Sequence, residues 1–340
     1  MTRIDLRSDT LTKPSHEMLM AMMSAKTGDM VFDEDPTVNE LEKRAAEMFN
    51  KEAGLFCPSG TMSNQVAVKV HTKPGDEVIC SRLAHIYMNE GGGIASNSGA
   101  SVSIIDTYDG TFTSDQVVSR INPDDPHKAH TCLVSVENTV NRGGGKVWKF
   151  DEIVRIGNVC REFNLKYHLD GARIFNALAE TSQRPPDYGK IFDSISFCFS
   201  KGLGAPVGSV LLGSKDFIKQ AKRIRKVFGG TMRQAGYVAA AGIYALENNI
   251  ERLKVDHKHA KMLEKILVKC SFVEKVLPVE TNIVIFRVSD KLQSSDIISG
   301  LLKHEIFALP IDSRNIRFVT HLDVNSEMIG IVCDVLQKLF

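Results

Sequence analysis

Short apolar runs alternate with segments of helical periodicity along this 340-residue chain, and this alternation restricts the possible folds more than any other feature. The apolar runs predict strands at 77–80, 101–105, 131–136, 166–169, 194–199 and 208–212. The helical patterns cover 39–49, 63–70, 151–163, 215–225 and 233–247. Strands that alternate with helices predict an α/β fold, in which helices cover both faces of a mostly parallel sheet.

Two parts of the chain depart from this alternation. Only residues 200–207 separate the last two predicted strands, which is too short for a helical crossover, so we expect this pair to be antiparallel. After about residue 250 the pattern changes to a charged helix at 251–269, a strand at 282–288, a further helix and a final strand at 317–320. We therefore predict an N-terminal arm and large domain at 1–248, and a small α+β domain at 249–340.

The composition argues against several classes of protein. A formal net charge of +1 gives no reason to expect nucleic acid or an acidic membrane as a partner. The chain shows no apolar signal core and no run approaching the ~18 apolar residues of a membrane helix. Its seven cysteines are scattered without a Cys-x-x-Cys pair, so we expect neither a disulfide framework nor a metal site. We predict a protein of the reducing cytoplasm.

A lysine follows an apolar strand directly and precedes two glycines in the segment 199–204, which reads Phe-Ser-Lys-Gly-Leu-Gly. Ligands sit at strand ends in α/β sheets, and glycines let a planar ligand approach the backbone. At such a position the shielded amine of Lys201 loses its proton more easily than a surface lysine does, and it can then attack a carbonyl group. The motif alone is equally typical of a surface turn.

Asp170 ends another predicted strand, 31 positions before Lys201, which leaves room for a helix and a strand between them. A buried carboxylate needs a cationic partner, and a protonated pyridine nitrogen would serve. The two residues could then address opposite ends of one pyridine ring. The alternatives are that Asp170 caps a helix or pairs with Arg173.

A turn of small residues at 57–64, Cys-Pro-Ser-Gly-Thr-Met-Ser-Asn, opens a predicted helix. The free N–H groups and the dipole of a helix N-terminus bind phosphate, which makes Gly60 and Thr61 the expected contacts. In isolation the same segment is more often a plain N-cap. It matches neither a Walker loop nor the dinucleotide-binding Gly-x-Gly-x-x-Gly pattern.

The order of phosphate turn, aspartate and lysine resembles that of fold-type I pyridoxal-phosphate enzymes. Six segments are more specific: 4–10 (IDLRSDT), 28–37 (GDMVFDEDPT), 137–139 (ENT), 168–177 (HLDGARIFNA), 200–209 (SKGLGAPVGS) and 319–324 (VTHLDV). They resemble the low-specificity L-threonine aldolases from residue 4 to about residue 324. The resemblance implies a mixed, mostly parallel seven-stranded sheet in a large domain that binds pyridoxal phosphate, beside a smaller C-terminal α+β domain.

The resemblance also implies how the cofactor is held. Lys201 would form a Schiff base with pyridoxal phosphate, and Asp170 would hold the pyridine nitrogen. His85 would stack on the ring. The full set expected to contact the cofactor is Gly60, Thr61, His85, Asp170, Arg173, Lys201 and, from a neighbouring subunit, Arg233.

For the substrate, the resemblance implies that Ser8, Arg173 and Arg317 bind the amino-acid carboxylate, which suits the fork of arginine. His85 and His127 would be the two imidazoles near the reacting hydroxyl, so the expected catalytic set is Lys201, His85, His127 and Asp170. Glu90 would orient a water. The alternative for each arginine is a structural ion pair, and the two histidines and Glu90 could be structural or plain loop residues.

The activity implied is retro-aldol cleavage of L-threonine, L-allo-threonine and related β-hydroxy-α-amino acids to glycine and an aldehyde. A homodimer or homotetramer with shared active sites is implied as well. The nearest rivals are a β-eliminating lyase and an aminotransferase, and a more distant one is a regulatory protein that binds the cofactor without turnover.

The chain departs from the family pattern at several positions. Phe32 and Asp33 stand where the family usually has Tyr-Gly, near the expected mouth of the active site. Val140 follows Glu-Asn-Thr where members often have His, and Thr231 interrupts a run of glycines. Because Phe32, Asp33 and Val140 do not touch the expected cofactor set, they bear on side-chain preference and on stereoselectivity at Cβ.

Overall fold

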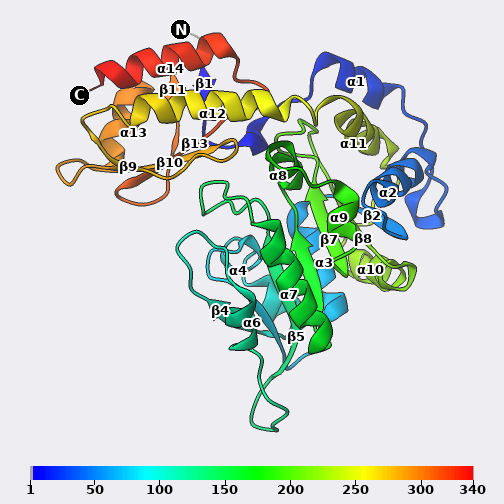
Figure 1. Ribbon diagram of the computed structural model, residues 1–340. Coiled ribbons are helices and arrows are strands. Elements are labelled where there is room, and N and C mark those ends of the chain that lie inside the picture. The colour runs from blue at the N-terminus through cyan, green and yellow to red at the C-terminus, as the bar shows by residue number, and fades with distance from the viewer. Residues whose placement is uncertain (1–2, 340) are drawn as a thin grey trace.

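The computed structural model describes residues 3–339, and its large part is built on one mixed sheet (Figure 1). Seven strands pair in the order β2-β8-β7-β6-β5-β3-β4. Their bounds are β2 Ala53–Cys57, β3 Asp76–Ser81, β4 Ser101–Ile105, β5 His130–Glu137, β6 Lys166–Asp170, β7 Ser194–Cys198 and β8 Ser209–Gly213. Strand β8 runs antiparallel to both of its neighbours, β2 and β7, and the other pairs of this sheet are parallel. The predicted seven-stranded, mostly parallel sheet is confirmed, and so is the antiparallel pair around Lys201.

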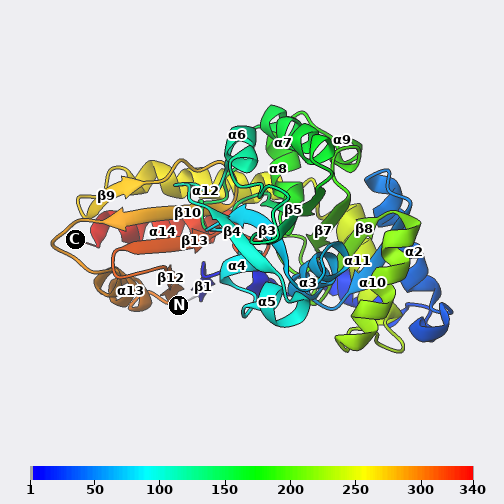
Figure 2. The ribbon, with the colours of Figure 1, turned by 90° about the horizontal axis from the view of Figure 1, so that it is seen from below.

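Helices cover both faces of this sheet, as its buried strands require. Figure 2 shows α3, α4 and α5 on one side and α6, α7 and α9 on the other. The helices of the large part are α2 Pro36–Met48, α3 Gly60–His71, α4 His85–Met88, α5 Gly93–Ser98, α6 Ser114–Val118, α7 Phe150–Glu162, α8 Ile174–Glu180, α9 Pro185–Gly189, α10 Lys215–Val227 and α11 Gly236–Asn248. Every residue of β7 and β8 is buried, because the helices cover both faces of the sheet.

Local chemistry sets where the helices begin. The side chain of Asp35 accepts hydrogen bonds from the backbone N–H groups of Thr37 and Val38, so α2 starts at Pro36, three residues before the predicted start. The other oxygen of Asp35 accepts from the N–H of Gly236, the first residue of α11. One buried carboxylate therefore caps two helices that lie far apart in the sequence.

The C-terminal part has its own sheet and its own core. Its strands pair in the order β12-β13-β10-β9, with bounds β9 Val273–Val276, β10 Ile283–Val288, β12 Leu309–Pro310 and β13 Asn315–Val319. The helices are α12 Leu253–Leu267, α13 Ser294–Leu302 and α14 Ser326–Lys338. Helix α14 was not predicted. Its apolar residues Ile329, Val332 and Leu336 complete the core of this part.

The N-terminal arm packs on this C-terminal part. Strand β1 (Ile4–Asp5) pairs in parallel with β11 (Ile306–Phe307), and the buried side chains of Ile4 and Leu6 join the second core. The division into 1–248 and 249–340 stays a prediction, and its residues Met1, Thr2 and Phe340 lie outside the described residues. The arm brings residues 5–9 to the edge where the two parts meet.

No helix within residues 3–339 is both long and apolar enough to cross a membrane. The carboxyl ends of β5, β6 and β7 point toward the C-terminal part, and β13 and the arm face them. This junction holds most of the polar residues that the sequence analysis singled out.

Candidate active site

The strand ends that carry the predicted lysine and aspartate are neighbours. In the sheet register, Glu137 at the end of β5 pairs with Asp170 at the end of β6, and Asp170 pairs with Ser196 of β7. Lys201 lies in the short turn between β7 and β8 and is half-buried. Its charge contributes to lowering the pKa of Asp9, a residue of the arm. Lys201 therefore sits where the large sheet meets the arm.

Asp170 is a buried carboxylate, 2% exposed, that forms no salt bridge within the described residues. Its Oδ2 accepts from Asn64 Nδ2 (2.9 Å), and its Oδ1 accepts from the N–H of Ala172 (3.1 Å). Among the described residues no Lys, Arg or His nitrogen lies within 4.0 Å of it, and Asp170 caps no helix. Neither alternative for Asp170, a helix cap or a pair with Arg173, is therefore observed. A buried carboxylate of this kind fits a protonated ring nitrogen.

The small-residue turn lies at the start of α3, beside the end of β7. Ser59 is the N-cap, and its hydroxyl accepts from the N–H of Met62 (3.1 Å). The first N–H groups of a helix have no acceptor within the helix, so those of Gly60 and Thr61 are open to an anion. A Cβ on Gly60 would lie 2.6 Å from Sγ of Cys198, so only glycine fits here. This close packing places the turn next to the strand that leads to Lys201.

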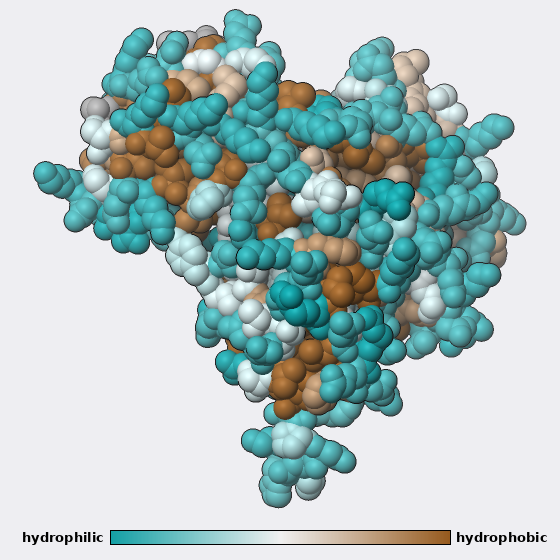
Figure 3. Space-filling view, in the orientation of Figure 1, coloured by the Kyte–Doolittle hydropathy of each residue, from teal (hydrophilic) through white to brown (hydrophobic). Residues whose placement is uncertain are grey.

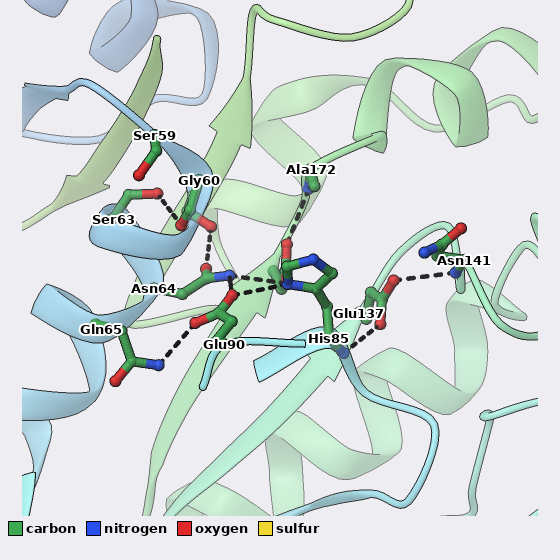
Figure 4. A network of polar contacts seen from close by, with 12 residues as sticks. Ser59, Gly60, Ser63, Asn64, Gln65, His85, Glu90, Glu137, Asn141 and Ala172 are labelled. Carbon is green, nitrogen blue, oxygen red and sulfur yellow. Dashed lines mark hydrogen bonds and ion pairs between the residues drawn. The ribbon is translucent and has the colours of Figure 1, made fainter. Parts of the chain in front are cut away.

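His85 is the first residue of α4 and belongs to a network of buried polar groups (Figure 4). Its Nδ1 lies 2.8 Å from Oε1 of Glu90. Glu90 also accepts from Asn64 Nδ2 (2.9 Å) and from Gln65 Nε2 (2.7 Å). Since a carboxylate only accepts, Nδ1 carries the hydrogen, which leaves Nε2 with the lone pair when His85 is neutral.

The charge on His85 is governed by these carboxylates. Burial disfavours the imidazolium, but the hydrogen bond to Glu90 and the charge of Asp170 outweigh burial and raise the pKa of His85 above 6.5. Glu137 is also buried, and burial together with the charge of Asp170 raises its pKa to about 7. The carboxylates around His85 therefore favour its protonated form.

Arg173 is buried and is held by a carboxylate of the protein itself. Its Nε donates to Oδ2 of Asp9 (2.7 Å), and its Nη2 donates to Oδ1 (2.6 Å). Although burial opposes it, the guanidinium holds the pKa of Asp9 well below its usual range. The structure therefore shows the ion pair that the sequence analysis kept as the alternative for this arginine. The roles of Arg173 toward substrate and cofactor stay predictions.

Arg317, on β13, has no carboxylate partner among the described residues. Its Nη1 donates to Oδ1 of Asn141 (2.7 Å) and its Nη2 donates to the carbonyl of Arg7 (3.1 Å), while its Nε is buried without an acceptor in residues 3–339. Burial and the charge of Arg173 lower the pKa of Arg317 to about 10, so it remains charged at neutral pH. A substrate carboxylate fits this unpaired guanidinium.

Arg317 and His85 line the same cavity, of about 250 Å³. Its other lining residues are Asn89, Asn141, Arg142, Ile285, Leu309, Pro310 and Ile311. Ser8, the third predicted carboxylate contact, lies in the arm between Arg7 and Asp9. Its hydroxyl accepts from the N–H (3.2 Å) and the hydroxyl (2.8 Å) of Thr10. The wall of the cavity thus carries both a guanidinium and an imidazole.

One chain does not bring His127 and Arg233 to this site. The side chain of His127 is 88% exposed and lies 2.8 Å from Asp125, in the segment between α6 and β5 that projects downward in Figure 1. This segment meets the amino end of β5, about 23 Å along the strand from the end that carries Glu137. Arg233 is exposed and pairs with Asp29 (3.0 Å). The roles of both residues stay predictions.

Of the departures from the family pattern, Phe32 and Asp33 lie on the surface and Val140 lies in the core. Phe32 is 68% exposed, and Asp33 pairs with Lys222 (2.7 Å) on the surface. Asp33 has φ 58°, in the left-handed region where glycine is favoured, which gives a physical reason for the glycine expected here from the family pattern. Val140 is buried. Their effect on substrate preference stays a prediction.

Sequence reasoning gave no role to four residues that organise the site: Asp9, Asn64, Glu137 and Asn141. Asp9 and Glu137 stand inside the segments that carried the resemblance, so a signal was present. Asn64 lies one helical turn after Gly60, and its side chain joins α3 to Asp170 and to Glu90. Asn141 has no local signal, because its partner Arg317 is 176 positions away.

Solved structures with the same fold show to which class of enzyme fold this chain belongs. A threonine aldolase from Leishmania major superposes with a TM-score of 0.86 over 99% of both chains, at 21% identity. A structure described as SPT with PLP superposes with a TM-score of 0.76 over 99% of this chain and 87% of the other, at 15% identity. The fold is that of the fold-type I pyridoxal-phosphate enzymes.

Sequence comparison narrows the class to a family. The model of the beta-eliminating lyase family matches residues 5–291. A low specificity L-threonine aldolase from Escherichia coli (strain K12) is 44% identical over 331 residues, which cover 96% of each chain. The chain belongs to the low-specificity L-threonine aldolases, within the beta-eliminating lyase family.

Proposed function

We propose that this protein cleaves L-threonine, L-allo-threonine and related β-hydroxy-α-amino acids to glycine and an aldehyde. The observation that carries the proposal is the cavity in which the unpaired guanidinium of Arg317 and the imidazole of His85 face one space. Such a substrate has a carboxylate for the first group and a hydroxyl for the second. The 44% identity to an aldolase over 96% of both chains supports the same activity.

The residues present fit pyridoxal phosphate as the cofactor. Lys201 would hold its carbonyl carbon through Nζ, the first turn of α3 at Gly60 and Thr61 would bind its phosphate, and His85 would stack on its ring. The buried carboxylate of Asp170, which has no basic partner within 4.0 Å in the described residues, would balance a protonated ring nitrogen. When bound, the cofactor supplies an electron sink for the negative charge that develops at Cα.

The other residues bind and orient the substrate. Arg317 would hold the carboxylate with its fork, and Ser8, in the adjacent arm, would add a hydroxyl contact. Arg173, whose fork is occupied by Asp9, would contribute mainly its positive charge. Fixing the carboxylate fixes the rotation of the substrate, so that the bond between Cα and Cβ is the one that breaks.

His85 would take the proton from the β-hydroxyl at Nε2. The hydrogen bond from Nδ1 to Glu90 selects the tautomer that has its lone pair on Nε2. Glu90 would thus orient the imidazole itself, in addition to any water that it binds. His127, from another subunit, would be the second imidazole near the hydroxyl.

We also propose that the protein acts as a homodimer or homotetramer in the cytoplasm, where it forms glycine and consumes threonine. Arg233 of a neighbouring chain would then complete the phosphate site. Helix α1 (His16–Met23) supports self-association, since Leu19, Met20 and Met23 are 43%, 50% and 76% exposed. Figure 3 shows apolar, pale brown side chains over this helix at the upper right of the view.

Product analysis tests the proposal against its nearest rivals. We expect the purified protein, loaded with pyridoxal phosphate, to convert L-threonine and L-allo-threonine to equal amounts of glycine and acetaldehyde. A β-eliminating lyase would release a 2-oxo acid and ammonia, and an aminotransferase would need a keto-acid acceptor. Either result without glycine would refute the proposed reaction, and so would tight amino-acid binding without any product.

A further inference from the structure

Glu137 occupies a central position in the site, although the proposed chemistry gives it no task. It is the last residue of β5 and is 6% exposed. Its backbone is anchored, because Nε1 of Trp148 donates to its carbonyl oxygen (2.9 Å). The carboxylate is therefore held at a fixed place in the edge that carries Asp170.

Both oxygens of this carboxylate accept from backbone groups of separate segments. Oε2 accepts from the N–H of His85 (2.8 Å), and Oε1 accepts from the N–H of Asn141 (3.0 Å). The first contact fixes the start of α4, and therefore the backbone position from which the imidazole of His85 extends. The second fixes the turn that follows β5 (Figure 4).

Asn141 extends this connection to the other end of the cavity. Its Oδ1 accepts from Nη1 of Arg317 (2.7 Å), and all three of His85, Asn141 and Arg317 line the same space. An unbroken path therefore runs from the backbone of His85 through Glu137 and Asn141 to the guanidinium. No other acidic side chain in the described residues accepts from both segments.

We propose that Glu137 is a positioning residue that sets the distance between the imidazole of His85 and the guanidinium of Arg317. The substrate presents its hydroxyl and its carboxylate at a fixed separation, so the two groups must be held in register to act on one molecule. This inference rests on the proposed function only where it concerns the substrate hydroxyl and His85. The connection from Glu137 to Arg317 would position the guanidinium for the carboxylate of any amino acid.

The charged groups that face Glu137 act on its carboxylate in opposite directions. Asp170 disfavours its negative charge, as burial does, whereas His85 favours that charge. Glu137 in turn helps to raise the pKa of Arg173 and of Cys80. The ionised form offers two acceptor oxygens to two N–H groups, whereas an amide offers one oxygen and presents a donor to the other N–H.

The substitution Glu137→Gln tests the proposal with two measurements. One is the Kd for glycine, which has a carboxylate but no β-hydroxyl, read from the change in cofactor absorbance. The other is kcat and KM for L-threonine. We expect Kd for glycine to rise about tenfold, as expected when a hydrogen-bonded charge is misplaced. We expect kcat to fall by up to about 100-fold.

Glu42→Gln is the matched control. Glu42 is also a largely buried carboxylate with a raised pKa that accepts from a backbone N–H, that of Phe56 (2.7 Å), but its partners are on α10 and β2. The substitution Glu42→Gln should leave Kd for glycine and kcat for L-threonine within about twofold of the wild-type values. If Glu137→Gln fails to fold, Asn141→Ala tests the connection from Glu137 to Arg317. This substitution should raise Kd for glycine more than it lowers kcat.

The outcomes separate the two proposals. Unchanged Kd and kcat in Glu137→Gln, or unchanged Kd in Asn141→Ala, would overturn the positioning role. A loss of thermal stability alone, with both constants retained, would also overturn it. If the wild-type protein does not cleave threonine but Glu137→Gln still weakens glycine binding, the proposed function fails and the connection to Arg317 stands.

Discussion

The carboxylate of Asp9 accepts two hydrogen bonds from the guanidinium of Arg173, with Nε–Oδ2 at 2.7 Å and Nη2–Oδ1 at 2.6 Å. Asp9 comes from the N-terminal arm, and Arg173 directly precedes α8. Both side chains are buried, so water does not screen the pair. This contact ties the arm to the end of the sheet that carries Asp170.

Asp9→Asn should therefore lower the free energy of unfolding by about 3–5 kcal/mol, because it leaves the buried charge of Arg173 unpaired. Urea denaturation of the apoprotein measures the effect. Asp5→Asn is the control, since the pair of Asp5 with Arg7 is partly exposed and should contribute within about 1 kcal/mol. Equal losses in the two variants would contradict a dominant role for the buried pair.

The same pair predicts a dependence of stability on pH. Arg173 depresses the pKa of Asp9 below its ordinary value of 3.8, so the ionised carboxylate stabilises the fold above that pH. This contribution is lost as pH falls from 3.8 toward the depressed folded-state pKa. We expect the difference in unfolding free energy between wild type and Asp9→Asn to shrink over that fall. A difference that grows on acidification would be inconsistent with the pair.

Lys201→Ala should remove the absorbance of covalently held cofactor and nearly all turnover, because no other lysine lies in the turn between β7 and β8. Lys222→Ala, which deletes the surface partner of Asp33, is the control and should retain both. Absorption spectra and glycine release measure the two properties. Full activity of Lys201→Ala would exclude this lysine as the cofactor residue.

Arg317→Gln should raise KM for L-threonine by about 10- to 100-fold, since a charged hydrogen-bonding partner of the substrate carboxylate is lost. Arg314→Gln, directly before β13 and paired with Glu274 (2.5 Å), should leave KM unchanged within about twofold. Steady-state kinetics at a fixed pH compare the two. A rise of KM in both variants would point to a general loss of structure.

The rate should rise with pH as His85 loses its proton, because only the neutral imidazole accepts from a hydroxyl. The inflection in kcat/KM is expected above 6.5, the ordinary pKa that Glu90 and Asp170 raise. Glu90→Gln removes one of these charges, so the inflection should move to lower pH. Glu152→Gln, remote from the site, should not move it. An unchanged or higher inflection in Glu90→Gln would show that Glu90 does not control the imidazole.

Much of the large domain could be predicted from local pattern. The predicted strand at 101–105 coincides with β4, and the short connection 200–207 correctly indicated an antiparallel pair. Strand β2 was missed, because an Ala-Gly-Leu-Phe-Cys run of five residues beside a helix gives little periodic signal. It is stabilised by pairing with β8, which follows more than 150 positions later.

The site was predictable to a similar degree. Motif order brought Lys201, Asp170 and the turn at Gly60 together, and the structure places them at adjacent strand and helix ends. The partners of these groups were not predictable. The packing of the N-terminal arm on β13 decides whether Arg173 contacts a substrate or Asp9. It also decides whether Arg317 has a carboxylate partner.

The sequence by itself indicated the class of chemistry, because the order of phosphate turn, aspartate and lysine, together with six longer segments, resembles one family of enzymes. It determined the alternation of strands and helices as well, since periodicity is a local property. Only the tertiary structure decided which partner each buried guanidinium has. The contacts span 164 positions for Asp9–Arg173 and 176 for Asn141–Arg317, and a separation of that size cannot be paired from local sequence.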